Sequence, residues 1–161
     1  MSSEQIIRGK IGDISCWGIC HPTEDPAKIE TAMCNILGMD ATFERTESDS
    51  HFDQKMILIT GHVKGNSSLA HILSRMSADD RRDLLAQLEE RLDDSNRLHA
   101  RFDKQSAFAG FPRLYTSTDP SLRKQKDSVD LEIRFTTYPG RREAAISFIR
   151  RFIIGEIEKQ G

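Results

Sequence analysis

Two segments of the chain alternate apolar and polar side chains with the two-residue period of a strand that buries one face. They are "RLHARFD", residues 97–103, and "VDLEIRFTT", residues 129–137. Strands of a parallel sheet covered by helices on both sides would be apolar on both faces, so one wet face per strand argues against that fold. The pattern predicts an α+β protein, a two-layer sandwich in which helices pack on one face of a largely antiparallel or mixed sheet.

Helix signals occur in four further places. Asp25 and Pro26 can begin a helix that Gly38 ends. The segments 66–76 and 77–94 read as two consecutive helices, and a final helix is expected after Gly140. In the second of the consecutive helices Ser77 and Asp80 resemble a capping box, and the expected buried stripe is Leu84, Leu85, Leu88 and Leu92.

The other expected strands cover residues 11–20, 41–47 and 54–64, with a short strand near 112–116. The segment "MILIT" in 54–64 is apolar on both faces, which predicts a central place in the sheet. At 161 residues the chain fits one domain, residues 11–161, after a flexible lead-in at residues 1–10.

Composition indicates a cytoplasmic protein without a membrane partner. Hydrophobic residues make up 37% and charged residues 30% of the chain, its apolar runs are too short to span a bilayer, and no secretory signal opens it. Three cysteines do not make a disulfide framework. Cys16 and Cys20 on one strand would lie roughly 13 Å apart, too far to share a zinc ion, so we expect reduced structural thiols.

Sequence motifs of common enzymes are absent. The chain has no GxGxxG, GxxxxGK, GxSxG or HExxH motif. The acidic runs "ADDRRD" and "EERLDD" fit the solvent face of a helix, and His51 with Asp49 and Asp53 fits a solvated loop better than a metal site. We therefore expect no catalytic residues, metal or cofactor.

Positive charge concentrates in the second part of the chain. Residues 1–96 carry ten Lys and Arg against 17 Asp and Glu, a net −7, and residues 97–161 carry 13 against eight, a net +5. A polyanion would bind the C-terminal part, unless the asymmetry is ordinary scatter of solvated charge. Arg97 and Arg101 share the wet face of one strand, and Arg134 lies on the wet face of another. Their guanidinium groups could hold phosphates or stack on bases.

Alternatives remain for each of these side chains. The arginines could instead pair across strands with Asp130 and Glu132. His99 could stack on a base or be an ordinary surface histidine. At the strand end, Asp103 is expected to cap the helical turn "KQSAFA". Lys104 and Gln105 could tie neighbouring loops together, or bind a phosphate and a base edge or 2′-hydroxyl.

Three segments carry a family resemblance: "HPTEDPAKIETAMCNILG", "RFDKQSAFAG" and "VDLEIRFTTYPGRREAAISFI". Over residues 11–153 they resemble an archaeal family of predicted RNA-binding, exosome-associated proteins. The resemblance implies a fold similar to the large-subunit ribosomal protein that binds 5S ribosomal RNA, and it allows a homodimer formed through the sheet. The matching motif positions are Asp25, Pro26, Asp103, Lys104, Gln105, Phe108 and Gly110. Relatives commonly have alanine and tyrosine where this chain has Ser106 and Phe108, so a role that needs the phenol hydroxyl does not transfer.

The leading expectation is a non-catalytic RNA-binding module that acts with RNA-processing proteins or the exosome. Its candidate RNA contacts are Arg97, His99, Arg101, Lys104, Gln105, Phe108, Arg113 and Arg134. The alternative is a protein-interaction or assembly subunit that binds a partner, or a second copy of itself, without RNA.

Overall fold

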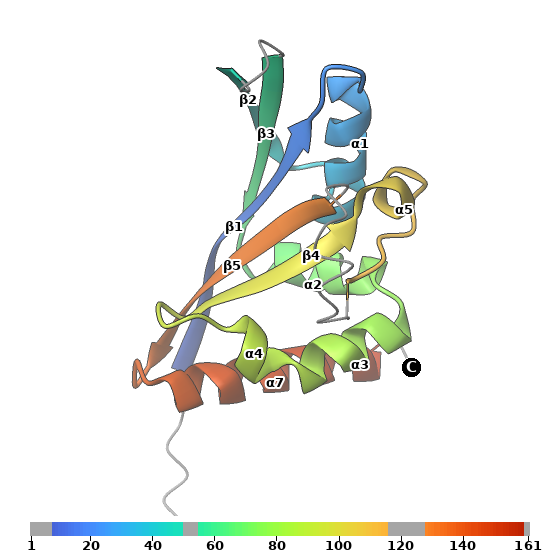
Figure 1. Ribbon diagram of the computed structural model, residues 1–161. Coiled ribbons are helices and arrows are strands. Elements are labelled where there is room, and N and C mark those ends of the chain that lie inside the picture. The colour runs from blue at the N-terminus through green and yellow to red at the C-terminus, as the bar shows by residue number, and fades with distance from the viewer. Residues whose placement is uncertain (1–7, 50–54, 116–127, 160–161) are drawn as a thin grey trace, which may run out of the picture.

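The computed structural model describes residues 8–49, 55–115 and 128–159, which form one five-stranded sheet with helices packed on it (Figure 1). The strand order is β2-β3-β1-β5-β4, and each neighbouring pair is antiparallel. The strands are β1 (Arg8–Cys20), β2 (Thr42–Asp49), β3 (Lys55–Lys64), β4 (Arg97–Asp103) and β5 (Ser128–Tyr138). The predicted α+β class with a largely antiparallel sheet is confirmed.

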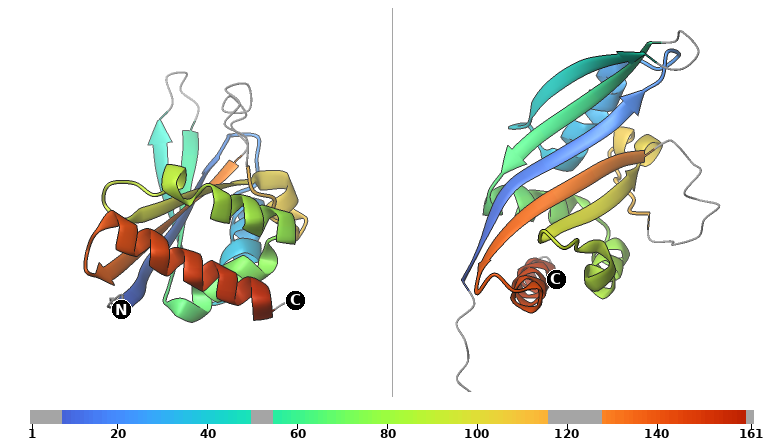
Figure 2. Two further views of the ribbon diagram at one scale, coloured as in Figure 1. Left: turned by 90° about the horizontal axis from the view of Figure 1, so that it is seen from below. Right: turned by 60° about the vertical axis from the view of Figure 1, so that its left-hand side comes forward.

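The helices cover one face of the sheet and leave the other, here called the outer face, open (Figure 2). They are α1 (Pro26–Leu37), α2 (Asn66–Arg75), α3 (Ala78–Ala86), α4 (Leu88–Arg91), α5 (Lys104–Phe108) and α7 (Arg142–Lys159). Among the described residues, none of these helices is long and apolar enough to cross a membrane.

The core lies between the sheet and the helices, where apolar burial supplies the main driving force for folding. Its fully buried side chains include Ile14, Ile59, Leu131 and Ile133 from the strands and Met33, Ile36, Ile72 and Leu73 from the helices. The predicted inward positions of β5 are all buried, as are Leu98, Ala100 and Phe102 of β4. Cys16 and Cys20 are buried on the inner side of β1 and are not oxidised to a disulfide.

Local signals place α1 as predicted. A side-chain oxygen of Asp25 accepts a hydrogen bond from the Ala27 N–H at 3.0 Å, and Pro26 occupies the first turn. Gly38 ends the helix with φ of 98°, a region that glycine enters without steric cost, and its N–H donates to the carbonyl of Cys34.

The predicted helix over 77–94 is broken into α3 and α4 at Gln87. Ser77 caps α3 as predicted, because its hydroxyl oxygen accepts from the Asp80 N–H at 3.1 Å. After the break, Leu92 leaves the helix and bridges to Leu98 of β4. The expected stripe is otherwise confirmed: Leu84, Leu88 and Leu92 are buried, and Leu85 is partly buried.

Three features of the strands differ from the sequence interpretation. β1 begins at Arg8, because residues 8–10 pair with the end of β5, so this part of the expected lead-in belongs to the sheet. β3 is internal, but the central strand is β1, and the outward Leu58 of β3 is exposed on the open face. In place of a strand near 112–116, the described part of that segment contributes one bridge, from Leu114 to Phe102.

Candidate nucleic-acid interface

The structure separates the eight predicted RNA contacts into two groups. Arg97, His99, Arg101 and Arg134 lie on β4 and β5, and Lys104, Gln105, Phe108 and Arg113 lie on α5 and the loop after it. β4 ends at Asp103, where the chain turns directly into α5 beside α1 (Figure 1). The seven residues of β4 therefore connect two distinct surfaces.

Lys104 is buried and binds other parts of the protein, which argues against a contact between its ammonium and an RNA phosphate. The residue is 6% exposed. Its ammonium donates to the Ile19 carbonyl at 3.0 Å and to both carboxylate oxygens of Glu24 at 3.2 Å. These acceptors use the three N–H donors of the ammonium, so it has none left for RNA. The structural alternative for Lys104 is the one that the geometry supports.

Asp103 has the capping role expected of it. One carboxylate oxygen accepts from the Ser106 N–H at 2.8 Å, and the other accepts from the Tyr115 hydroxyl at 3.1 Å. The carboxylate thereby fixes both α5 and the chain that returns past it. Gln105 points to solvent from α5 and stays a candidate contact.

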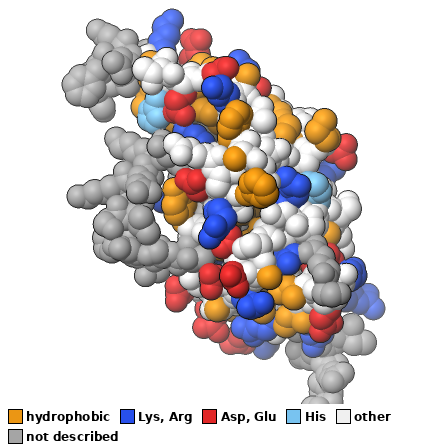
Figure 3. Space-filling model, turned by 90° about the vertical axis from the view of Figure 1, so that its right-hand side faces the viewer, with side chains coloured by type: hydrophobic (Ala, Val, Ile, Leu, Met, Phe, Trp, Pro, Cys, Tyr) orange, Lys and Arg blue, Asp and Glu red, His pale blue; other side chains and the backbone are white. Residues whose placement is uncertain are grey.

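The remaining residues of this group are exposed and are joined by neighbours that the sequence did not single out. Phe108 and Phe111 are 45% and 74% exposed, and the ammonium of Lys28 lies 5.9 Å from the centre of the Phe108 ring. Arg113 is exposed, and its Nε lies 3.8 Å from the buried carboxylate of Asp80. Figure 3 faces this side of the molecule, where basic, acidic and apolar side chains lie interspersed. The signal for Phe111 was present in "AFAGF", a run of small and aromatic residues.

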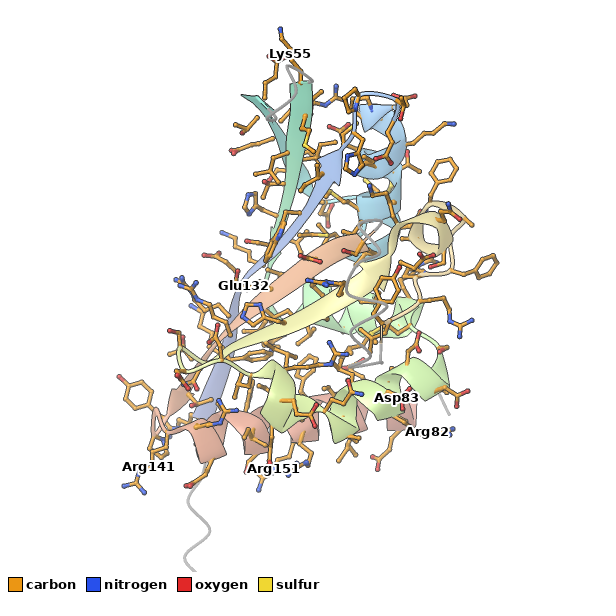
Figure 4. All side chains as sticks on the ribbon, in the orientation of Figure 1. Lys55, Arg82, Asp83, Glu132, Arg141 and Arg151 are labelled. Atoms are coloured by element: carbon orange, nitrogen blue, oxygen red, sulfur yellow. The ribbon has the colours of Figure 1, made fainter. Side chains whose placement is uncertain are left out.

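On the outer face, the predicted cross-strand ion pairs are present. Nε of Arg101 donates to Asp130 at 3.0 Å, and Nη1 of Arg97 donates to Glu132 at 3.0 Å. Glu132 lies on the sheet well away from α7 in Figure 4. Exposed pairs of this kind contribute only about 0–1 kcal/mol to stability, so a phosphate can compete for the same guanidinium groups.

His99, on β4, binds a residue of the turn that precedes the strand. Its Nε2 lies 2.7 Å from a carboxylate oxygen of Asp93, whose other oxygen accepts from the N–H groups of Ser95 and Arg97. Burial raises the pKa of Asp93, but the hydrogen bonds from His99 and the two backbone N–H groups prevail and lower it. This contact favours the ordinary structural role of His99 over base stacking.

Arg134 has the least expected environment. It lies directly opposite Arg97 in the antiparallel register, and like charges at such positions repel. Arg97 is paired with Glu132, whereas within residues 8–49, 55–115 and 128–159 Arg134 has no ion-pair partner. Its exposed side chain is therefore available to an anion.

Two basic residues that the sequence had placed in a flexible lead-in join this end of the outer face. In the register of β1 and β5, Lys10 faces Thr136 and Arg8 faces Tyr138. Both alternate with Gly9 and Ile11, which point inward to the α7 layer, so both project outward. We call Arg8, Lys10, Arg97 and Arg134 the basic end of the outer face.

The described residues offer no alternative site for metal or thiolate chemistry. Within those ranges no three His, Cys, Asp or Glu side chains come together as metal ligands, and the His51 loop lies outside them. Burial, followed by the nearby charge of Asp130, raises the pKa of Cys16, which favours the unreactive thiol.

Known proteins resemble the chain in both sequence and fold. RNA-binding protein PAB1135 of Pyrococcus abyssi is 25% identical over 145 residues, which cover 84% of this chain and 89% of that protein. Crystal structures of protein AF2318 from Archaeoglobus fulgidus and of protein SSO0741 from Sulfolobus solfataricus superpose with TM-scores of 0.72 and 0.66. Their sequence identities are 24% and 19%, they cover 89% and 92% of this chain, and 99% of each structure is matched.

The family model described as RNA binding matches residues 13–135. This range covers most of the chain and contains all eight residues predicted as RNA contacts, together with β4, α5 and most of β5. The chain belongs to this RNA-binding family.

Proposed function

We propose that the chain is a non-catalytic RNA-binding module that holds RNA phosphates at the basic end of its outer face. The observation that carries this proposal is the direct opposition of Arg97 and Arg134 on neighbouring strands. Two like charges at such positions are unfavourable in the free protein. A phosphate between them turns that repulsion into two attractions, and guanidinium groups suit phosphate oxygens because they donate in parallel pairs.

The surroundings of these arginines favour an extended polyanion. Lys10 and Arg8 continue the positive charge along β1, and all the helices of the described ranges lie on the other face of the sheet (Figure 2). Tyr138, opposite Arg8, is largely exposed and offers an aromatic face beside the charges. Phosphate contacts supply affinity and orientation rather than sequence preference.

RNA is the expected polyanion because of the family and because PAB1135, a relative, is called an RNA-binding protein. The finer proposal is that the module acts in the cytoplasm with RNA-processing proteins, the exosome among them. It is supported by the resemblance of the segments containing "PTEDPAKI" and "DKQSAFAG" to exosome-associated proteins. The same resemblance supports a likeness to the ribosomal protein that binds 5S ribosomal RNA.

The test is a fluorescence-anisotropy titration of labelled RNA with wild type, Arg134→Ala and the control Arg151→Ala. Arg151 is an exposed arginine on α7, away from the outer face (Figure 4). We expect Arg134→Ala to weaken binding and Arg151→Ala to match wild type, with circular dichroism confirming that both are folded. Equal affinities for the two variants, or wild-type binding that does not respond to salt, would contradict the proposal.

One observation favours the alternative of an assembly subunit. Ile19 and Leu58 are cross-strand neighbours on the outer face, 44% and 37% exposed, next to the half-buried Trp17. A second copy of the chain could cover this apolar pair and form a homodimer through the sheet. Light scattering at high salt without RNA tests the homodimer: a dimer that Leu58→Asp dissociates would support the alternative, and a monomer would exclude self-assembly through this apolar pair.

A further inference from the structure

We propose that the surface around α5 binds the unpaired bases of single-stranded RNA, with Phe111 and Phe108 as stacking platforms. We call this surface the aromatic corner; its residues are Lys28, Arg75, Phe108, Phe111 and Arg113. The proposal rests on the proposed function, and it adds a second contact and the class of RNA that the protein prefers.

The first support is that the two rings stay in solvent although their loop is firmly held. The side-chain amide of Asn35 donates to the carbonyl of Ala107 at 2.8 Å, and Arg75 donates to that of Gly110 at 3.0 Å. The Phe111 N–H donates to the Ser106 carbonyl at 2.9 Å. A loop ordered in advance loses little conformational entropy when a ligand binds, so the exposed rings are ready for stacking.

Gly110 makes the turn between the two rings possible. Its φ is 95°, in the left-handed region that other residues rarely enter. This turn directs the chain from α5 into the exposed segment that carries Phe111, the more exposed of the two rings. The backbone thus presents Phe111 outward instead of folding it into the core.

The second support is the charge around the rings. Lys28 lies over the Phe108 ring, and Arg113 is 70% exposed. Two nearby carboxylates already have partners within the protein: the buried Asp80 accepts from the Leu114 N–H, and Glu24 accepts from Lys104. The solvent side therefore combines aromatic faces with positive charge, which suits bases and phosphates of a single strand. A duplex keeps its base faces stacked inside and cannot use such rings.

The aromatic corner and the basic end lie at opposite ends of β4 (Figure 1). From Arg97 to Asp103 the strand rises roughly 20 Å, at about 3.3 Å per residue. The two surfaces can therefore be altered separately, and each can be tested while the other is intact.

The experiment measures the affinity of an unstructured 12-nucleotide RNA and of a 12-base-pair RNA duplex for wild type, Phe111→Ala, Phe111→Tyr and Ile154→Ala. Ile154, on α7, is the control for loss of an exposed apolar side chain. We expect Phe111→Ala to weaken single-strand binding by about five- to 150-fold, the range found for one stacked base. Phe111→Tyr should restore it, because a phenol ring stacks as well. Duplex affinity should not change.

Several results would overturn the inference. If Phe111→Ala binds the single strand like wild type while Arg134→Ala binds it more weakly, the aromatic corner is not a base site and the proposed function stands. Equal losses on single strand and duplex would exclude stacking as the cause. If folded wild type binds neither RNA, the proposed function fails and the inference fails with it.

Discussion

Replacing Lys104 by methionine would remove the buried ammonium and keep most of the buried aliphatic stem. In the native protein this ammonium joins α5 to the end of β1 through the Ile19 carbonyl, and to the turn between β1 and α1 through the Glu24 carboxylate. Removing one partner of a buried ion pair costs about 3–5 kcal/mol. The side chain of Glu24 is 29% exposed, so water can partly replace the lost donor, and we expect the low end, about 3 kcal/mol.

Lys104→Ala should cost more, because it also removes buried methylene groups at about 0.8 kcal/mol each. Urea unfolding followed by circular dichroism measures both variants, and the dependence of the unfolding free energy on urea should keep its slope. For Lys104→Met, 3 kcal/mol corresponds to a melting temperature lower by about 6–12 °C in a chain of this size. In a double-mutant cycle with Glu24→Gln, the double variant should lose less stability than the sum of the two single variants, since the two side chains bond directly.

RNA binding by Lys104→Met tests whether the Lys104 ammonium only stabilises the fold or also contacts RNA. At a temperature where the variant is folded, its RNA affinity should equal that of wild type, because the ammonium has no donor left for a phosphate. A stability loss below about 0.5 kcal/mol, the usual size for a surface substitution, would refute the structural reasoning. Weaker RNA binding with unchanged stability would restore Lys104 as a phosphate contact.

Three further outcomes test the fold. Gly9→Ala should destabilise the protein by about 1–3 kcal/mol in urea unfolding, because a Cβ there would overlap the Phe148 ring, whereas Gly12→Ala on the same strand should be tolerated. Cys16 should react with a thiol reagent at pH 8 only after unfolding, since burial raises its pKa and shields it. Labelling of Cys16 in the folded protein as fast as in the unfolded protein would contradict this. Asp93 has a lowered pKa in the folded state, so its stabilising contribution is present above its ordinary pKa and is lost as pH falls through the lowered one. The stability advantage of wild type over Asp93→Asn should therefore shrink below about pH 4. An advantage that grows below that pH would contradict a lowered pKa of Asp93 in the folded protein.

Local patterns in the sequence predicted much of the fold. The alternation in β4 gave its bounds because a strand with one wet face repeats every two residues. The start and end of α1 followed from Asp25, Pro26 and Gly38, which act within one turn of the helix. The break at Gln87 was not predictable in this way, because it depends on Leu92 reaching β4.

The candidate site was less predictable because its features depend on contacts between distant segments. Lys104 is buried by a turn 80 residues earlier in the chain, so its neighbours in sequence could not reveal its partners. Arg97 could have faced Glu132 or Arg134, depending on a register of β4 and β5 that shows only in the folded sheet. Lys10 resembled part of a frayed terminus until its strand paired with β5.

The central claim, that the basic end of the outer face binds RNA phosphates, is tested most directly by the salt dependence of binding. The comparison is between wild type and the double variant Lys10→Ala, Arg134→Ala, with an unstructured RNA over a range of salt concentrations. Each lost phosphate contact should reduce the slope of log affinity against log salt by about 0.7, so the double variant should lose about 1.4. Parallel lines for the two proteins would contradict the account.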